Sequence, residues 1–366
     1  MKRTLSLLLC AAMALTLFAG CGPKNTNESS SSAPGSESSS SAGSSASQSG
    51  SGGESAAFTQ PKLMVLSGPT GVGAAKLMAD WTYAEEHDQR TPDGKFIVID
   101  SAEVVTDNTE VAAALTNGDA DIAAIATNAA ANLFAKTDGG IQVLAVNTLG
   151  VLYILEKGNT VQTMADLAGK TLYCPSNTKG GNPEHILNHL LEKNGVSPSD
   201  VDIQWLTPQE ITAKLTSSDA GICMLPVPAA TALMVQDSGV RQALSLSEEW
   251  ENLGEGPLPM GCIVARTQYV EENSEGVEAF LSAYEESIAY MSDPDNLADA
   301  AALVAQFGIT PNAKVAEMAI PQCNLTYVTG KEMHTMLEDY YSILFQAAPD
   351  SIGGGLPYDS FYYGVG

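Results

Sequence analysis

The sequence predicts an α/β fold for the chain from Pro61 onward. Short apolar stretches of strand length alternate there with amphipathic stretches of helix length. The strand-like stretches are apolar throughout, which is typical of strands in parallel sheets that helices cover on both faces. Apolar residues make up 44% of the chain, enough to build such cores. We therefore expect parallel sheets packed between helices.

The first set of alternating elements runs up to Gly150. Its predicted strands are Lys62–Leu66, Phe96–Asp100, Asp121–Ala126 and Ile141–Asn147. Its predicted helices are Gly71–Glu86, Asn108–Asn117 and one that starts near Asn128.

The same pattern begins again after Gly150. The predicted strands are Thr171–Cys174, Val201–Trp205 and Gly221–Leu225, and the predicted helices are Asn182–Asn194, Pro208–Ser217 and Val227–Asp237. The last third, Ser274 to Ala347, reads as nearly all helix, with new starts at Pro294 and Pro311. Two α/β units in tandem followed by helices predict two lobes.

The net negative charge of the chain excludes some classes of binding partner. The chain has 17 Lys and Arg against 43 Asp and Glu, a formal net charge of −26. The first 57 residues are balanced, so this excess lies on the globular part. Nucleic acid binding depends on clustered Lys and Arg and is therefore excluded, as is docking on anionic lipid through a basic face.

The N-terminal residues predict export. Lys2 and Arg3 precede an apolar run from Thr4 to Gly20, which is typical of a signal peptide over residues 1–20. Phe18-Ala19-Gly20-Cys21 resembles a bacterial lipobox, so we expect Cys21 to carry a fatty-acyl anchor such as palmitate. The alternative is an ordinary secretory signal with an incidental Cys21.

Residues 21–57 read as a disordered linker. From Ser29 to Ser55 there are 15 Ser in 27 residues, and such a composition buries no surface. A linker that starts at an acylated Cys21 would hold the globular part outside a membrane, at the cell surface or in the periplasm.

The remaining thiols and the histidines predict no metal site. Four cysteines, Cys174, Cys223, Cys262 and Cys323, allow three pairings, and spacing does not choose among them. His185 and His189 are four residues apart, but no Glu lies between them as in zinc-binding helices. The buried stripe of this helix places both on its solvent side.

Loops that follow strands are the candidate binding residues, because ligands bind beyond the carboxyl ends of strands in open parallel sheets. The Gly-rich first loop fits neither a P-loop nor a dinucleotide pattern, and reads as a turn with free backbone N–H groups. Trp81 and Tyr153 are read as core residues in preference to a stacking face. The candidate residues are Ser67, Gly68, Thr70, Gly71, Thr127, Asn128, Ser176, Asn177, Thr178, Lys179 and Pro226.

Several stretches resemble one family, the substrate-binding proteins of ABC importers in the nitrate/sulfonate/taurine and thiamine-precursor group. They are Ser67–Gly71, Asn117–Ala123, Thr127-Asn128, Asp166–Thr171, Asn182–Glu184, Leu225–Pro228, Leu356-Pro357 and Phe361–Tyr363. The resemblance covers residues 61 to 366.

This resemblance implies a type II periplasmic-binding-protein fold, with two α/β lobes joined by two crossing strands and a ligand in the cleft between them. The crossings would lie near Asn147–Leu155 and Gly261–Arg266. Residues 61–149 plus 262–366 would form one lobe and residues 150–261 the other. The lobes would close on the ligand by hinge motion.

The resemblance also implies the partners. We expect a monomer without catalysis or cofactor that delivers a small organic solute to an ABC permease and its ATPase. No Arg lies in the candidate loops, which favours a solute with at most one acidic group. Two alternatives stay open: an enzyme like the thiamine-pyrimidine synthases, and a sensor or adhesion module on the same fold.

Overall fold

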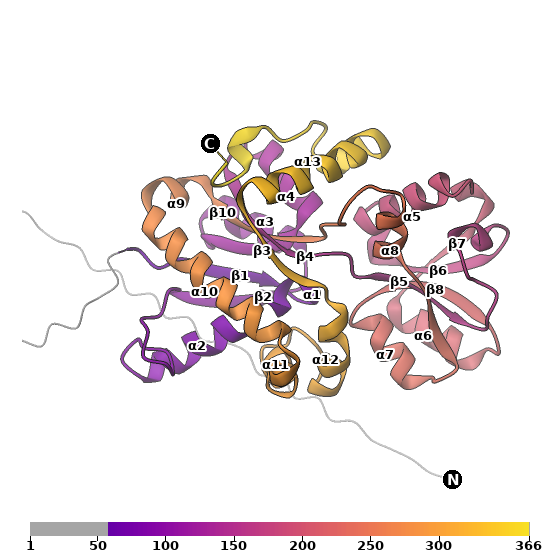
Figure 1. Cartoon of the computed structure of the whole chain (residues 1–366), viewed down its shortest axis with the longest axis horizontal. Coiled ribbons are helices and arrows are strands. Elements are labelled where there is room, and N and C mark those ends of the chain that lie inside the picture. Colours follow the sequence, from indigo (N-terminus) through magenta and orange to yellow (C-terminus); the bar gives the residue numbers. More distant parts are fainter. Residues whose placement is uncertain (1–57, 366) are drawn as a thin grey trace, which may run out of the picture. The chain divides into compact units, whose positions relative to one another are not determined.

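The computed structural model describes residues 58–365, and these residues form two sheets with helices on both faces (Figure 1). The predicted α/β class is confirmed. The predicted signal peptide, Cys21 and the Ser-rich linker lie outside the described residues. Within the described residues, none of the helices combines the length and the apolar character needed to cross a membrane.

The first sheet has six strands in the order β11-β4-β10-β3-β1-β2. Their bounds are β1 Lys62–Leu66, β2 Ser101–Val105, β3 Ile122–Ala126, β4 Ile141–Thr148, β10 Gly261–Arg266 and β11 Leu325–Val328. We call this sheet and the helices packed on it lobe one. The parallel strands β2, β1 and β3 are followed by β10, which runs antiparallel to both β3 and β4.

Nine α-helices within the described residues belong to lobe one. They are α1 Pro69–Val72, α2 Ala75–Glu86, α3 Asn108–Asn117, α4 Thr127–Lys136, α9 Thr267–Glu272, α10 Ser274–Ser292, α11 Leu297–Gln306, α12 Ala313–Ala319 and α13 Gly330–Ala347. Apolar side chains of α3, α4 and α13 cover one face of the sheet, and those of α2, α9 and α10 cover the other (Figure 1).

The second sheet has five strands in the order β7-β6-β8-β5-β9. Their bounds are β5 Leu152–Lys157, β6 Thr171–Pro175, β7 Asp202–Leu206, β8 Gly221–Pro226 and β9 Val240–Ser245. Its helices are α5 Asn182–Lys193, α6 Pro208–Ser217, α7 Ala229–Gln236 and α8 Leu246–Asn252. We call this sheet with its helices lobe two. Helices α5 and α8 cover one face, and α6 and α7 cover the other.

The prediction of parallel sheets is wrong in part, because both sheets are mixed. In lobe two, β6 runs parallel to β7 and β8, whereas β5 is antiparallel to its neighbours β8 and β9. The strands β9 and β11 were not predicted, and β11 interrupts the stretch that was read as nearly all helix.

The predicted strand Phe96–Asp100 is also wrong, since the second strand is Ser101–Val105. Ile97 and Ile99 are fully buried in the cluster that includes α2, which explains their apolar character. The backbone of Ile97 bonds outside the sheet, however: its N–H donates to the Gln89 carbonyl and its carbonyl accepts from the side chain of Gln60, which is 37 residues away. Burial without a strand partner produced the strand-like pattern.

Two connections join the lobes. Leu149–Val151 leads directly from β4 into β5, and residues 253–260 lead from α8 into β10. The second crossing was predicted near Gly261–Arg266, and the second connection ends directly before this segment, which forms β10 of the first sheet.

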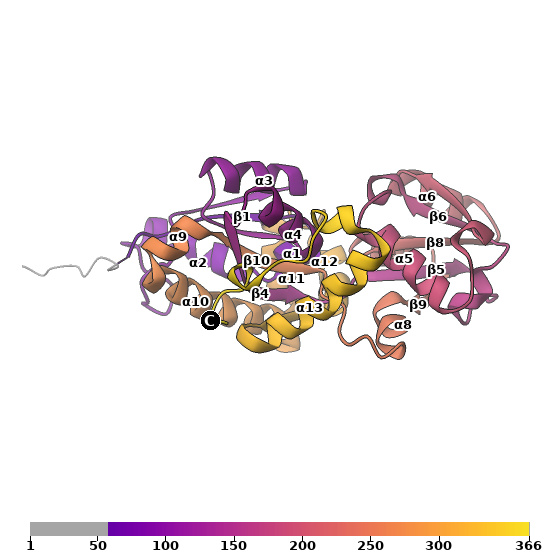
Figure 2. The same cartoon turned by 90° about the horizontal axis from the view of Figure 1, so that it is seen from above.

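Side chains also link the two lobes. The Tyr340 hydroxyl on α13 donates to Asn182 Oδ1 on α5 at 2.6 Å, and both views show α13 extending toward α5 (Figures 1 and 2). Asn182 Nδ2 in turn lies 3.8 Å from the Met260 sulfur. On the opposite faces of the sheets, the Tyr153 hydroxyl donates to the Gln322 carbonyl at 3.1 Å. Tyr153 is buried, as the sequence predicted.

Among the described residues, Cys174, Cys223, Cys262 and Cys323 are all free thiols and all buried. This resolves the pairing that spacing left open. Burial raises the pKa of the Cys174 thiol to about 12, and it raises the pKa of Cys323 equally, to about 12. The thiolate is the reactive form, so these side chains behave as core residues.

We therefore expect none of these four thiols to react with iodoacetamide at pH 8 in the folded protein, and all four to react in concentrated urea. Peptide mass spectrometry measures the alkylation of each of these four cysteines, and it distinguishes them from Cys10 and Cys21. Alkylation of any of the four in native buffer at the rate of glutathione would contradict the burial.

A second prediction concerns the contact between α13 and α5. The substitution Tyr340→Phe keeps the ring but leaves the buried Asn182 oxygen without its donor, so the free energy of unfolding should fall by about 1–3 kcal/mol. Urea denaturation measures it. Tyr358→Phe is the control, because the Tyr358 side chain is 56% exposed, and it should have no effect. Equal stability of the two variants would contradict the role of this hydrogen bond.

Candidate functional site

The candidate loops of each lobe lie at the sheet edge from which the chain passes to the other lobe. In lobe one, β4 ends at Thr148, which pairs with Gly261, and Gly261 pairs with Ala126 at the carboxyl end of β3. In lobe two, β5 begins at Leu152, which pairs with Pro226 at the carboxyl end of β8. Only Leu149–Val151 separates these two edges.

The first loop is bound more tightly within lobe one than the sequence predicted. The N–H of Ser67 donates to the Val105 carbonyl at 2.7 Å, and the N–H of Gly68 donates to the Ile309 carbonyl at 3.1 Å. The N–H of Gly71 donates to the Gly68 carbonyl. The prediction of free backbone N–H groups is therefore wrong for these three residues.

The backbone conformation of this loop requires two of its glycines. Gly68 has φ 88°, in the left-handed region that glycine adopts without strain. A Cβ on Gly71 would collide with the Leu66 carbonyl oxygen, so this close approach requires glycine. Thr70 is buried, and its carbonyl accepts a hydrogen bond from Asn147 Nδ2 at 2.9 Å.

Thr127 and Asn128, at the start of α4, have different environments. Thr127 is fully buried, and its hydroxyl donates to the Pro259 carbonyl at 2.8 Å. Its carbonyl accepts from the Tyr341 hydroxyl at 2.9 Å. Thr127 therefore anchors α4 to the second connection. Asn128 is partly exposed and lines a cavity of about 300 Å³.

The lobe-two loop reaches the same cavity. Gly180 lines it together with Asn128, so the cavity has walls from both lobes. Its polar lining includes the amides Asn108 and Asn132, together with Lys136 and Asp350. Amide groups donate and accept hydrogen bonds, which suits a polar organic molecule.

The other residues of this loop are mostly exposed. Ser176, Asn177 and Lys179 are exposed, and the Thr178 hydroxyl donates to the Pro175 carbonyl at 2.7 Å. The Lys179 ammonium lies 5.9 Å from the centre of the Trp205 ring. Glu184 accepts from the Gly180 N–H, so this loop does carry one carboxylate at its end.

Pro226 ends β8 and is partly exposed beside Leu152. Of the predicted site residues, Asn128 lines this cavity, whereas Ser176, Asn177, Thr178 and Lys179 do not, although Gly180 of the same loop does. Pro226 lies at the edge near the first connection. The structure does not place the Ser67–Gly71 loop in that cavity.

Sequence reasoning missed the residues that join the two edges. Asn182 was quoted only as a helix start, although its side chain bridges α5 to Tyr340 and Met260. Its position directly before Pro183 at the start of a helix is the signal that the sequence offers for it. Asn147 and Tyr340 lie in an apolar strand and an amphipathic helix, and nothing local distinguishes them.

The prediction that His185 and His189 both lie on the solvent side of their helix is wrong for His189. Its Nε2 lies 2.7 Å from Glu255 Oε2, and the two side chains are only 11% and 14% exposed. Its ring lies 5.0 Å from that of Trp250. No group of three or more His, Cys, Asp or Glu side chains within residues 58–365 is arranged to hold a metal ion.

Solved structures share this fold. A protein described as an ABC transporter from Parabacteroides distasonis is 22% identical, with 83% of this chain and 98% of that chain covered and a TM-score of 0.65. The periplasmic aliphatic sulphonate-binding protein of Escherichia coli is 18% identical, with 82% and 94% covered and a TM-score of 0.62.

A Candida albicans gene product described as having the generic periplasmic binding protein structural fold is 15% identical, with 81% and 94% covered and a TM-score of 0.51. The predicted periplasmic-binding-protein fold is thereby confirmed. No curated protein matches the chain by sequence.

The family model described as NMT1/THI5 like matches residues 100–297, more than half of the chain. This match includes β2 to β10 and therefore both connections between the lobes. It confirms the resemblance found in the loop motifs. The chain belongs to the NMT1/THI5-like family of the periplasmic-binding-protein fold.

Proposed function

We propose that this protein is an extracytoplasmic solute-binding lipoprotein that captures a small organic solute between its lobes and delivers it to an ABC importer. The observation that carries the proposal is the convergence of Asn128 from lobe one and Gly180 from lobe two on one cavity. A site with walls from two lobes makes all its contacts only when the lobes are together.

Binding would therefore act on the equilibrium between open and closed forms. A ligand that touches both lobes has its full contacts only in the closed form, so it shifts the population toward that form. Hinge bending would be concentrated at Leu149–Val151 and residues 253–260, where the lobes are connected by backbone.

The lining supports a solute with at most one acidic group. Asn108, Asn128 and Asn132 offer neutral donors and acceptors, and the charged lining residues are one cation, Lys136, and one carboxylate, Asp350. A monoanion such as a sulfonate or carboxylate fits this set, whereas a multiply charged oxyanion lacks an Arg to hold it. The sulphonate-binding name of one solved relative agrees with this class.

The delivery step rests on the fold relatives that are named as parts of ABC transporters. We propose an ABC permease and its ATPase as partners, and a monomeric receptor anchored through lipid on Cys21. The same names favour transport over the synthase-like enzyme.

A thermal-shift panel of sulfonates, carboxylates, pyrimidines and amines tests the binding function. Ligand at about 100 times its dissociation constant adds about 2.7 kcal/mol of stability, so at least one class should raise the melting temperature. Asn128→Ala should reduce that shift, because it removes an amide from the cavity.

Asn117→Ala is the matched control, since Asn117 is an exposed amide at the opposite end of α3 from Asn108. It should leave the shift unchanged. If no compound of the panel raises the melting temperature, solute capture is refuted. If Asn128→Ala leaves the ligand-induced shift unchanged, the solute site does not include Asn128.

The lipid anchor makes a separate prediction. Cys21→Ser removes the acylated sulfur, so the protein should leave the membrane fraction, as immunoblots of fractionated cells will measure. Cys10→Ser lies inside the predicted signal peptide and should fractionate like the parent. Membrane retention of Cys21→Ser would show that Cys21 is not the anchor.

A further inference from the structure

A second cavity lies in lobe one, and none of the residues that line the proposed solute site lines it. It has a volume of about 500 Å³ and is lined by α2, α10 and the segment 91–98, with Asp93, Lys95 and Glu286 more than half exposed to solvent. Cavities of roughly 300–1,000 Å³ are typical of sites for small organic ligands. None of the loop residues predicted to bind the solute lines it.

The space exists because α10 presents small residues to it. Ala279, Ser282 and Ala283 follow helical spacing and share the face of α10 that lines the cavity. Larger side chains at these positions would fill the volume that separates α10 from α2.

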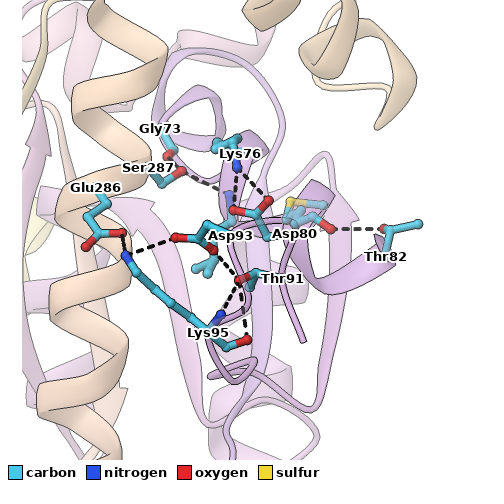
Figure 3. Close-up of polar contacts among 11 residues, drawn as sticks. Gly73, Lys76, Asp80, Thr82, Thr91, Asp93, Lys95, Glu286 and Ser287 are labelled. Carbon is cyan, nitrogen blue, oxygen red and sulfur yellow. Dashed lines mark hydrogen bonds and ion pairs between the residues drawn. The ribbon is translucent and has the colours of Figure 1, made fainter. Parts of the chain in front are cut away.

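A buried serine fixes the separation of the two helices. The Ser287 hydroxyl donates to the Gly73 carbonyl at 2.6 Å and accepts from the Leu77 N–H at 3.1 Å, and its side chain is 1% exposed (Figure 3). A Cβ on Gly73 would collide with Ile288, so the helices approach closely at this point. The cavity is therefore preformed, since its walls are joined independently of any ligand.

The charged groups of the cavity do not balance. Lys76 pairs with Asp80 at 2.5 Å, and Lys95 lies between Glu286 at 2.6 Å and Asp93 at 3.4 Å (Figure 3). Two ammonium groups thus face three carboxylates, which leaves an excess of one negative charge.

The third carboxylate stays ionised. A hydrogen bond from the Thr91 hydroxyl lowers the pKa of Asp93, and the hydrogen bond to Glu286 raises the pKa of Lys95. Asp93 and Glu286 therefore share one cation at neutral pH.

The remaining wall is apolar and aromatic. Leu77, Phe96 and Ile97 line the cavity, and Tyr290 closes it with a ring whose centre lies 5.3 Å from the Lys76 ammonium. Apolar area buried from water stabilises a bound molecule in proportion to that area. A ligand with an apolar body and one charged end matches such walls.

We propose that this cavity binds a small organic monocation, namely an ammonium group on an apolar body. The ammonium would lie between Asp93 and Glu286 beside Lys95 and supply the missing positive charge. The body would lie against Leu77, Phe96 and the small residues of α10. An organic anion would meet ammonium groups that already have carboxylate partners, and it would add to the negative excess.

Isothermal titration of the full chain in detergent with 2-phenylethylammonium tests the proposal. The neutral 2-phenylethanol and the anionic 3-phenylpropionate have similar bodies and should bind more weakly, in that order. Glu286→Gln removes one carboxylate and should weaken the binding of 2-phenylethylammonium about threefold to fivefold, which is the effect of losing one exposed ion pair. Glu285→Gln, the adjacent exposed residue outside the cavity, is the matched control and should leave the affinity unchanged.

Ala283→Leu should abolish binding by filling the cavity, with circular dichroism confirming that the variant is folded. Ser282→Leu serves the same purpose should Ala283→Leu fail to fold. Asn128→Ala should leave ammonium binding unchanged, which separates this cavity from the proposed solute site. Absence of binding by the ammonium probe, equal binding of the anion, or full binding in a folded cavity-filling variant would overturn the proposal.

Discussion

The buried side-chain amide of Asn147 ties together three parts of lobe one at the point where the chain leaves it for lobe two. Its Nδ2 donates to the Thr70 carbonyl at 2.9 Å and to the Tyr284 hydroxyl at 2.8 Å. Strand β4, the loop after β1 and helix α10 are thus held by one group with no exposure to water. Losing a buried partner of this kind costs about 1–3 kcal/mol, so this edge has one preferred arrangement.

The same constraint determines the residue at Gly261, which pairs with Thr148, the neighbour of Asn147 in the chain. A Cβ on Gly261 would come within 2.8 Å of Asn147 Oδ1 and 2.9 Å of Thr70 Oγ1, so β10 can begin here only with glycine. Lobe one is fixed in this way, and it is joined to lobe two by the two backbone connections and by side-chain contacts such as that of Tyr340 with Asn182.

Capping residues allowed the ends of some helices to be predicted to the residue. The bounds of α3 match because Asp107 caps its start by accepting from the Thr109 N–H, and Gly118 ends it with φ 78°. The bounds of α6 match because Thr207 and Glu210 form a capping box. These interactions span three or four residues, so they can be read directly from the chain.

Strand direction and the arrangement of the site depend on interactions between residues far apart in the sequence. Strand direction depends on the partner, so the antiparallel placement of β10 between β3 and β4 is not encoded within its own six residues. The same limit applies to the site. The candidate loops were found because they follow strands, whereas the bond between Asn182 and Tyr340 joins residues 158 positions apart. Thr127 and Asn128 are adjacent polar residues, and only packing makes one an anchor and the other a wall of the cavity.

The interrupted order of the first sheet has a consequence for folding. Its strands β1 to β4 precede lobe two, while β10 and β11 follow it, and β10 lies between β3 and β4. Until β10 has been synthesised, β3 and β4 lack the strand that joins them. The five strands of lobe two are contiguous in the chain, so their pairing closes shorter loops. We expect the inserted lobe to fold first, and the lobe with which the chain begins to be completed last.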